Sequence, residues 1–144
     1  MTQAGGMQHP GILHLYIHLM EMSPHPDRAL KAADALRNLV PDAGHLQHMP
    51  THIDILCGHY ERVVTSNQVA IDAYRKFLER EGPLNFYSLY RCHDYHFKIY
   101  GAMFMGRYKG AIETSDEMIS TLPEDLFTIE SSPLWPTGWR GSFR

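Results

Sequence analysis

The feature that most constrains the fold of this chain is a short pattern that recurs along it. A Gly-x-Tyr triplet followed three residues later by a small apolar residue occurs at 58–63 and again at 106–111, and residues 24–29 have the same phase. Successive copies lie 34 and 48 residues apart, so the second interval is one 34-residue period with an insertion, which we place around residues 81–91. A constant period of this length is typical of helical repeat arrays.

The hydrophobic pattern predicts an all-α chain, because apolar residues recur with helical spacing and no sustained strand-like alternation appears. Prolines and glycines separate the predicted helices. Pro50 falls inside one of them, so we expect a kink there. The helices are expected at residues 12–22, 27–40, 45–57, 60–79, 85–105 and 108–122.

These elements predict three helix-turn-helix units in a right-handed array. Residues 1–9 are expected to be a flexible lead, and residues 10–123 to form the repeat domain. Residues 124–144 are rich in apolar side chains, prolines and glycines. We expect this tail to be irregular and to pack on the last repeat, because its apolar side chains would otherwise be left in water.

Composition excludes several classes of protein. A chain of 144 residues fits one domain, and its net charge of −3 predicts neither a nucleic-acid nor an anionic-membrane partner. The N-terminus lacks the basic and apolar regions of a secretory signal. Cys57 and Cys92 lie too far apart in the sequence for a CxxC motif, so a reducing compartment is expected and the protein is predicted to be cytoplasmic.

Ten of the residues are histidines, and most of them recur in register with the repeat. Aligning the three copies places His14, His48 and His96 at one equivalent position. The position four residues later is occupied by His18, His52 and Tyr100, and the position three residues earlier by Gly11, His45 and His93. Residues three and four apart share a face of a helix, so the repeat phase gathers these side chains on one surface.

The 34-residue spacing, the Gly-x-Tyr turns and the closing Pro41 and Pro123 resemble tetratricopeptide repeats. Within residues 9–54, runs such as HLYIH and AGHLQHMPTHI resemble a family of little-characterised, histidine-rich bacterial and fungal tetratricopeptide-domain proteins. The resemblance implies that the first helix of each repeat lines a concave groove. It also implies that the aligned histidines face that groove.

Two imidazoles and a carboxylate share one face of the first predicted helix at His14, His18 and Glu21. Imidazole binds zinc, copper and iron, and carboxylate often completes such a ligand set. We therefore expect a transition metal shared between neighbouring helices, which could assist a reaction on a small molecule. The expected ligands are His14, His18, His48 and His52, with Glu21 and His52 as candidate catalytic residues and His45, His93, His96 and Tyr100 lining the groove.

Two other functions remain open from the sequence. The groove could bind a peptide or protein partner, although it is poor in the lysines that clamp peptide carboxylates. Alternatively, a histidine with a shifted pKa could act as a metal-free acid or base. The sequence does not decide between an enzyme and a binding protein, and it leaves open whether the chain forms a homo-oligomer.

Overall fold

A computed structural model describes residues 5–123, and this part of the chain is all-helical without a β-strand. The predicted tail, residues 124–144, lies outside the described residues, as do residues 1–4. The α-helices are α1 (Pro10–Glu21), α2 (Leu30–Leu36), α3 (Gly44–His48), α4 (Thr51–Leu56), α5 (Tyr60–Glu81), α6 (Ser88–Phe104) and α7 (Tyr108–Ser120). Single 3-10 turns precede α1 and α2 at Gly6–Gln8 and Pro26–Ala29.

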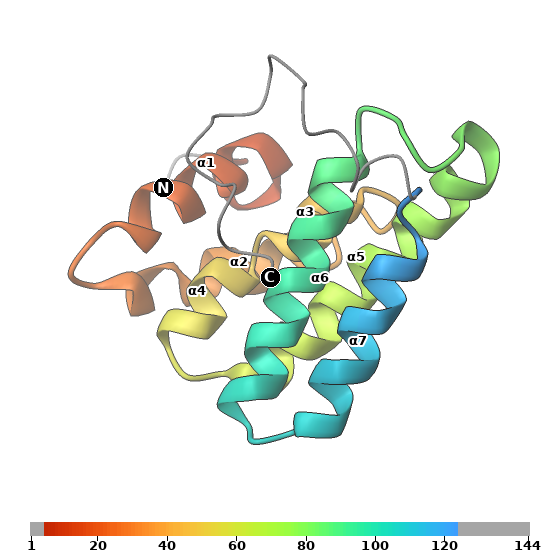
Figure 1. Ribbon diagram of the computed structural model, residues 1–144. Helices are drawn as coiled ribbons and strands as arrows, with labels where there is room; N and C mark the ends of the chain where they lie inside the picture. The colour runs from red at the N-terminus through yellow and green to blue at the C-terminus, as the bar shows by residue number, and fades with distance from the viewer. Residues whose placement is uncertain (1–4, 124–144) are drawn as a thin grey trace, which may run out of the picture.

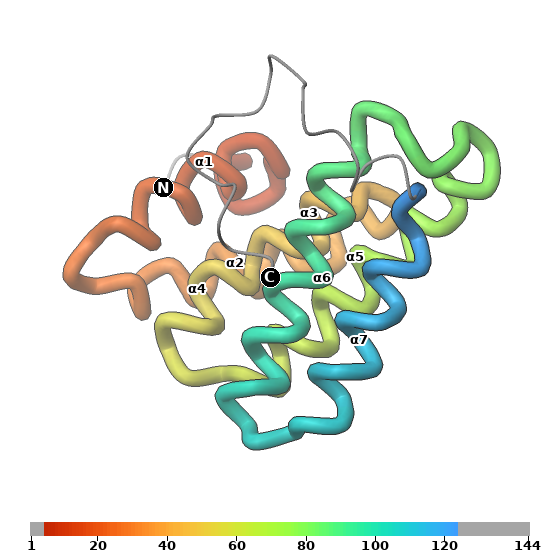
Figure 2. The backbone as a smooth tube through the Cα atoms, viewed as in Figure 1, coloured from red at the N-terminus to blue at the C-terminus, as the bar shows by residue number. Residues whose placement is uncertain are grey.

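The short helices α3 and α4 lie between two helical regions (Figure 1). On one side, α1 packs against α4 and α2. On the other, α5, α6 and α7 run alongside one another as long neighbouring rods, which the tube in Figure 2 shows clearly. Because α3 and α4 contact both regions, their side chains can meet those of α1 and of α6.

The local sequence explains how α1 begins and which face it buries. Pro10 occupies the first turn, where its missing N–H costs nothing. The side chain of His9 caps the helix by accepting a hydrogen bond from the backbone N–H of Ile12 at 3.3 Å. Leu13 and Ile17, four residues apart, are fully buried. The adjacent face of α1, which carries His14 and His18, points toward α3 and α4.

The predicted interruption at Pro50 is confirmed as a break between α3 and α4. Met49 and Pro50 nevertheless both keep right-handed helical dihedral angles, with φ of −49° and −55°. Asp54 N–H donates to the carbonyl of Pro50 at 3.1 Å, so helical bonding resumes immediately. The two helices therefore stay in phase, and His48 and His52 remain on one side despite the proline.

The two Gly-x-Tyr turns have the same backbone structure. Gly58 and Gly106 adopt left-handed φ angles of 79° and 68°, which glycine reaches without steric cost. The following N–H, of His59 or Arg107, donates to a carbonyl five residues earlier at 2.8 and 2.9 Å. This is the Schellman arrangement that ends a helix, and it reverses the chain into α5 and α7.

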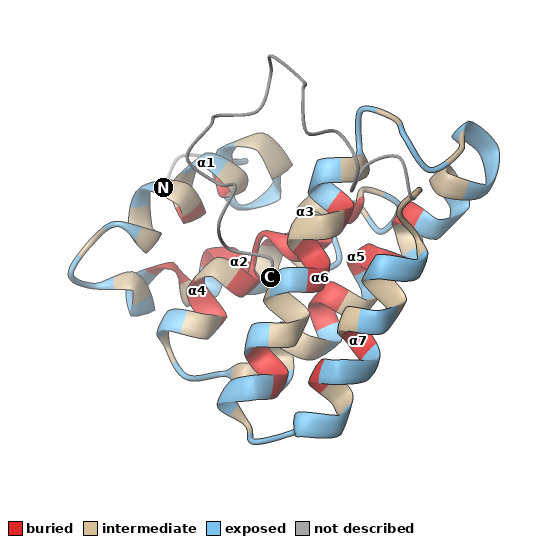
Figure 3. Ribbon diagram, viewed as in Figure 1, coloured by how far each residue is buried: buried red, intermediate tan, exposed pale blue. Residues whose placement is uncertain are grey.

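A core cluster of α1, α2 and α4 anchors the N-terminal part of the protein. Leu13, Ile17, Leu36 and Ile53 are fully buried in it. Figure 3 shows buried residues concentrated where α2, α3 and α4 meet α5 and α6. Between α5 and α6, a Cβ on Gly101 would come within 3.2 Å of the Tyr60 carbonyl oxygen, so the missing side chain permits their close approach.

Among residues 5–123, no helix combines the length and the apolar character needed to cross a membrane.

Candidate metal centre

Six imidazole rings from α1, α3, α4 and α6 form a continuous series of contacts, which we call the histidine layer. Neighbouring ring centroids lie 4.7 to 5.4 Å apart along this series, from His14 to His18, His18 to His52, His52 to His48 and His48 to His93. His45 joins it through His14, at 5.0 Å. The layer consists of His14, His18, His45, His48, His52 and His93.

The ring nitrogens of the histidine layer fall into two groups of three. Within each group, one nitrogen from every residue lies within 4.8 Å of the others. We call His48, His52 and His93 the buried triad, and His14, His18 and His45 the outer triad. The four histidines predicted to share one ion are thus divided between two neighbouring groups, each completed by a residue that the sequence placed only in the groove lining.

His48 is fully buried, and its ring orientation is determined by Asn67 on α5. The Asn67 side-chain amide nitrogen donates to the carbonyl of Val63 at 2.8 Å, so its Oδ1 faces the imidazole. His48 Nδ1 lies 2.7 Å from this oxygen and must therefore carry the proton and donate. The neutral ring consequently presents the lone pair of Nε2 on its other side.

His52 is held in the same way by Glu21 on α1. Its Nδ1 lies 2.5 Å from Glu21 Oε2, so Nδ1–H donates to the carboxylate and Nε2 keeps its lone pair. The two Nε2 atoms of His48 and His52 are only 2.9 Å apart. With both Nδ1 protons already committed, two lone pairs face each other across this contact.

The third member of the buried triad comes from α6. His93 contacts the His48 ring at 4.7 Å and the ring of Phe97 at 4.9 Å. Phe97 also contacts His48 and His52, at 4.7 and 4.8 Å. An aromatic side chain from α6 therefore packs against all three rings of the triad.

Burial favours the neutral form of the imidazoles in the buried triad. Desolvation lowers the pKa of His48 well below its ordinary value, and neighbouring His52 lowers it further. Desolvation also lowers the pKa of His52 to about 4, although the Glu21 carboxylate acts in the opposite direction. Burial therefore disfavours a proton shared between the two facing Nε2 atoms.

A buried carboxyl group lies next to the triad. Asp94 is fully buried, and neither of its oxygens has a hydrogen-bond partner among the described residues. Its Oδ1 is 3.3 Å from His48 Nδ1. Burial raises the pKa of Asp94 to about 9. By contrast, the equally buried Asp54 pairs with Arg37 at 2.8 Å, as expected of a structural carboxylate.

The outer triad is more open and less constrained. His18 Nδ1 lies 2.9 Å from Glu21 Oε1, which leaves its Nε2 as the free nitrogen. His45 Nδ1 is buried and has no hydrogen-bond partner in the described part of the chain. Burial lowers the pKa of His14 and lowers that of His45 to about 4. Both rings therefore present nitrogen lone pairs.

Two predicted groove residues lie outside both triads. His96 and Tyr100 are exposed on α6. They are four residues apart and share one helical face, whereas His93 and Phe97 share the neighbouring face that packs on the layer. In the third copy of the pattern, it is therefore His93 that contacts the other histidines. His93 occupies the position equivalent to His45.

Three residues around the buried triad were not predicted from the sequence. They are Asn67, Asp94 and Phe97. Asn67 lies in the predicted second helix of a repeat, opposite the aligned histidines, and had no pattern to mark it. For Phe97 a signal was present, because it lies four residues after His93 on the same helical face. Asp94 had none, because adjacent residues of a helix do not share a face.

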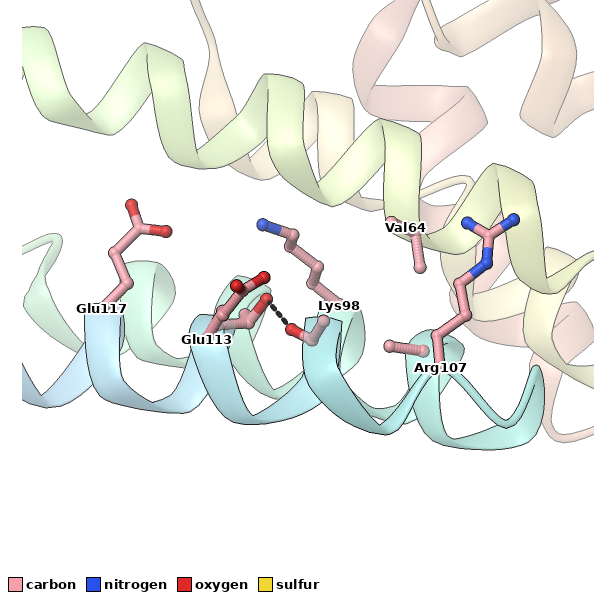
Figure 4. Close-up of a pocket in the computed structure, with 8 residues that line it drawn as sticks. Val64, Lys98, Arg107, Glu113 and Glu117 are labelled. Carbon is pink, nitrogen blue, oxygen red and sulfur yellow. Dashed lines mark hydrogen bonds between the residues drawn. The ribbon is translucent and has the colours of Figure 1, made fainter.

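One hollow of the described structure lies between α5, α6 and α7, away from the histidine layer. Its lining includes Lys98 and Arg107 (Figure 4). Both cations are already paired, Lys98 with Gln68 at 2.5 Å and Arg107 with Glu61 at 2.6 Å.

A second hollow adjoins the histidine layer. Its lining includes His45, Tyr74, Phe77 and Tyr87. It therefore brings an aromatic surface up to the edge of the outer triad.

Comparison of the chain with protein-family models, with curated proteins and with solved structures finds no match in any of the three. The geometry of the histidine layer is therefore the basis for inferring a function.

Proposed function

We propose that the protein binds a first-row transition-metal ion through the nitrogens of His48, His52 and His93. The observation that carries this proposal is the 2.9 Å contact between the Nε2 atoms of His48 and His52. Their Nδ1 protons are both committed to oxygen acceptors, Asn67 Oδ1 and Glu21 Oε2. Two opposed lone pairs repel each other unless a cation lies between them.

The spacing and the surroundings fit a metal ion. Two nitrogens that bind one ion at about 2.0–2.1 Å each lie roughly 3 Å apart. Histidine ligands of metals usually donate their second ring N–H to a carboxylate or another oxygen, which orients the ring and increases its basicity. His52 and His48 have such partners in Glu21 and Asn67. We assign Glu21 this orienting role instead of direct ligation.

Three imidazole ligands suit zinc, copper or iron. Three protein ligands leave coordination positions for water or a substrate, as in catalytic zinc sites. An ion bound there would act as a Lewis acid and lower the pKa of a bound water. We propose that the substrate is a small molecule, and that it approaches through the aromatic hollow beside His45.

The proposal includes a repeat architecture of the tetratricopeptide type. Its support is the shared turn structure at Gly58 and Gly106. In addition, the aligned small residues Ala29, Val63 and Ala111 are all buried. Repeats of this kind account for histidines from successive first helices lying on one surface.

Metal titration of protein purified without a histidine tag tests the function. We expect the wild-type chain to retain Zn²⁺, Cu²⁺ or Fe²⁺ after dialysis, and His52→Ala to lose the ion of the buried triad. His96→Ala is the matched control, because it removes an exposed histidine outside both triads. Retention by His52→Ala equal to wild type, or no retention by any of these proteins, would overturn the proposal. In the latter case, a protonated His48–His52 pair becomes the explanation of the short contact.

A further inference from the structure

Glu21 is the only carboxylate among the described residues that contacts histidines of both triads. Its Oε1 lies 2.9 Å from His18 Nδ1, and its Oε2 lies 2.5 Å from His52 Nδ1. Both imidazoles therefore donate their Nδ1 protons to one carboxyl group. Their free Nε2 atoms belong to different triads.

The outer triad has the features of a ligand set of its own. One ring nitrogen from each of His14, His18 and His45 lies within 4.8 Å of the others. His18 has an orienting carboxylate, as metal-bound histidines commonly do. His45 has a buried Nδ1 without a hydrogen-bond partner among the described residues, and such an atom is costly unless it binds a donor or an ion.

We infer that the outer triad binds a second transition-metal ion, and that Glu21 is the shared positioning residue of a two-metal centre. This inference rests on the proposed function, because Glu21 orients one ligand of the buried ion. The rings of His18 and His52 lie 5.4 Å apart, centroid to centroid, so the two ions are close neighbours. The bound species are two divalent transition-metal cations per chain.

The two sites are expected to differ in affinity. In the buried triad, two of three ligands have their Nδ1 held by an oxygen, whereas in the outer triad only His18 does. Orienting partners are typically worth about 10–100-fold in metal affinity. The outer ion therefore binds more weakly and exchanges first with a chelator.

Calorimetric titration with Zn²⁺, together with metal content after dialysis, tests the inference on the full untagged chain. Wild type is expected to bind two equivalents. The double variant His14→Gln/His45→Gln should lose the weaker equivalent and keep the tighter one. His52→Ala should lose the tighter one. His14 and His45 are only partly buried, and thermal unfolding monitored by circular dichroism verifies that each variant is folded.

Glu21→Ala separates a shared anchor from two independent sites. Alanine accepts a hydrogen bond from neither His18 nor His52, so both sites should weaken by about 10-fold or more. Glu113→Ala, at an exposed glutamate on α7, is the matched control and should bind like wild type.

The possible failures are distinguishable. One equivalent that His52→Ala removes and His14→Gln/His45→Gln leaves unchanged would overturn the second site and leave the proposed function intact. Weakening of only one site in Glu21→Ala would overturn the shared role of this carboxylate. Absence of any binding in wild type would instead reject the proposed function itself.

Discussion

The two triads of the histidine layer have the same three side chains but differ in what holds them. In the buried triad, His48 has no exposed surface and His52 has 14%. Asn67 and Glu21 fix their tautomers, and Phe97 covers them. In the outer triad, His18 is 40% exposed, and Glu21 is the one orienting side chain. The two groups of three histidines are therefore not equivalent, because burial and the hydrogen bonds of the Nδ1 atoms determine how well the remaining lone pairs converge.

Removal of metal should produce the largest effect, and it distinguishes the triads directly. A ligand present at 100 times its Kd stabilises the folded state by about 2.7 kcal/mol. We therefore expect a chelator to lower the Tm of metal-loaded protein by roughly 10 °C, as measured by differential scanning calorimetry. His93→Ala should lose most of this shift and His14→Ala little of it. Equal losses in the two variants would contradict the difference in affinity.

Acid should remove the stability that the neutral His52 and His45 contribute to the metal-free protein. The pKa of His52 and that of His45 are about 4 in the folded state, below the value of about 6.5 in an unfolded chain. At these two groups the unfolded state binds more protons, so their contribution to stability is fully present above pH 6.5 and is lost as the pH falls toward 4. For His52 the loss is at most about 3 kcal/mol.

Urea unfolding at pH 7 and pH 5 measures this loss. The raised pKa of Asp94 acts in the opposite direction over this range, so the informative quantity is the difference between wild type and His52→Ala. The chain with His52→Ala should lose less stability between pH 7 and pH 5 than wild type. An equal change in the two chains would show that His52 is not held neutral.

Asn67→Ala should weaken the buried triad and spare the outer one. It removes the acceptor of His48 Nδ1–H, which would leave a buried donor unpaired at a cost of about 1–3 kcal/mol. Metal affinity of the tighter site should fall by about 10–100-fold, as read from Zn²⁺ calorimetry. Asn38→Ala, at an exposed asparagine, is the control. An unchanged tighter site would show that the tautomer of His48 does not depend on Asn67.

Gly44→Ala should disturb both triads together, because α3 carries a residue of each. A Cβ at Gly44 would lie 2.6 Å from Tyr74 Cε2, so α3 must shift, at about 1–3 kcal/mol. Gly110→Ala is the matched control. A Cβ there meets no atom within 4 Å, and the change should stabilise α7 by about 0.5–1 kcal/mol. Thermal unfolding gives both signs, and a neutral Gly44→Ala would contradict the close packing.

His96→Ala and Tyr100→Phe should have the smallest effects. Both side chains are exposed and lie in neither triad. Zn²⁺ affinity and stoichiometry should remain within about twofold of wild type, since no orienting contact worth 10-fold is lost. A larger change would mean that the groove extends along α6 beyond His93.

Much of the local structure was predictable. The all-helical character is confirmed, and so is the interruption at Pro50. These features depend on interactions within a few residues, where spacing and proline chemistry suffice. The second helix was less well predicted: α2 ends at Leu36, although the apolar pattern continues to Val40. Residues 37–43 lie outside the helices, between the end of α2 and the start of α3.

For the candidate site, the sequence predicted the surface on which the histidines gather, but not which of their nitrogens converge. The repeat phase gathered His14, His18, His45, His48 and His52, since it specifies which face of a helix a residue occupies. It could not specify which nitrogens converge, because that depends on how far neighbouring helices are offset and rotated. The sequence therefore did not show that His93, and not His96, lies in the buried triad. It also did not show that Asn67 accepts the Nδ1 proton of His48.

By itself, the sequence determined the helices, their turns at Gly58 and Gly106, and the placement of histidines on one face of each. Only the tertiary structure decided the division into two triads, their unequal burial and the position of Glu21 between them. The physical reason is that helical periodicity is a local property of the backbone. The protonation and direction of each imidazole, by contrast, are determined by acceptors on other helices, distant in the sequence.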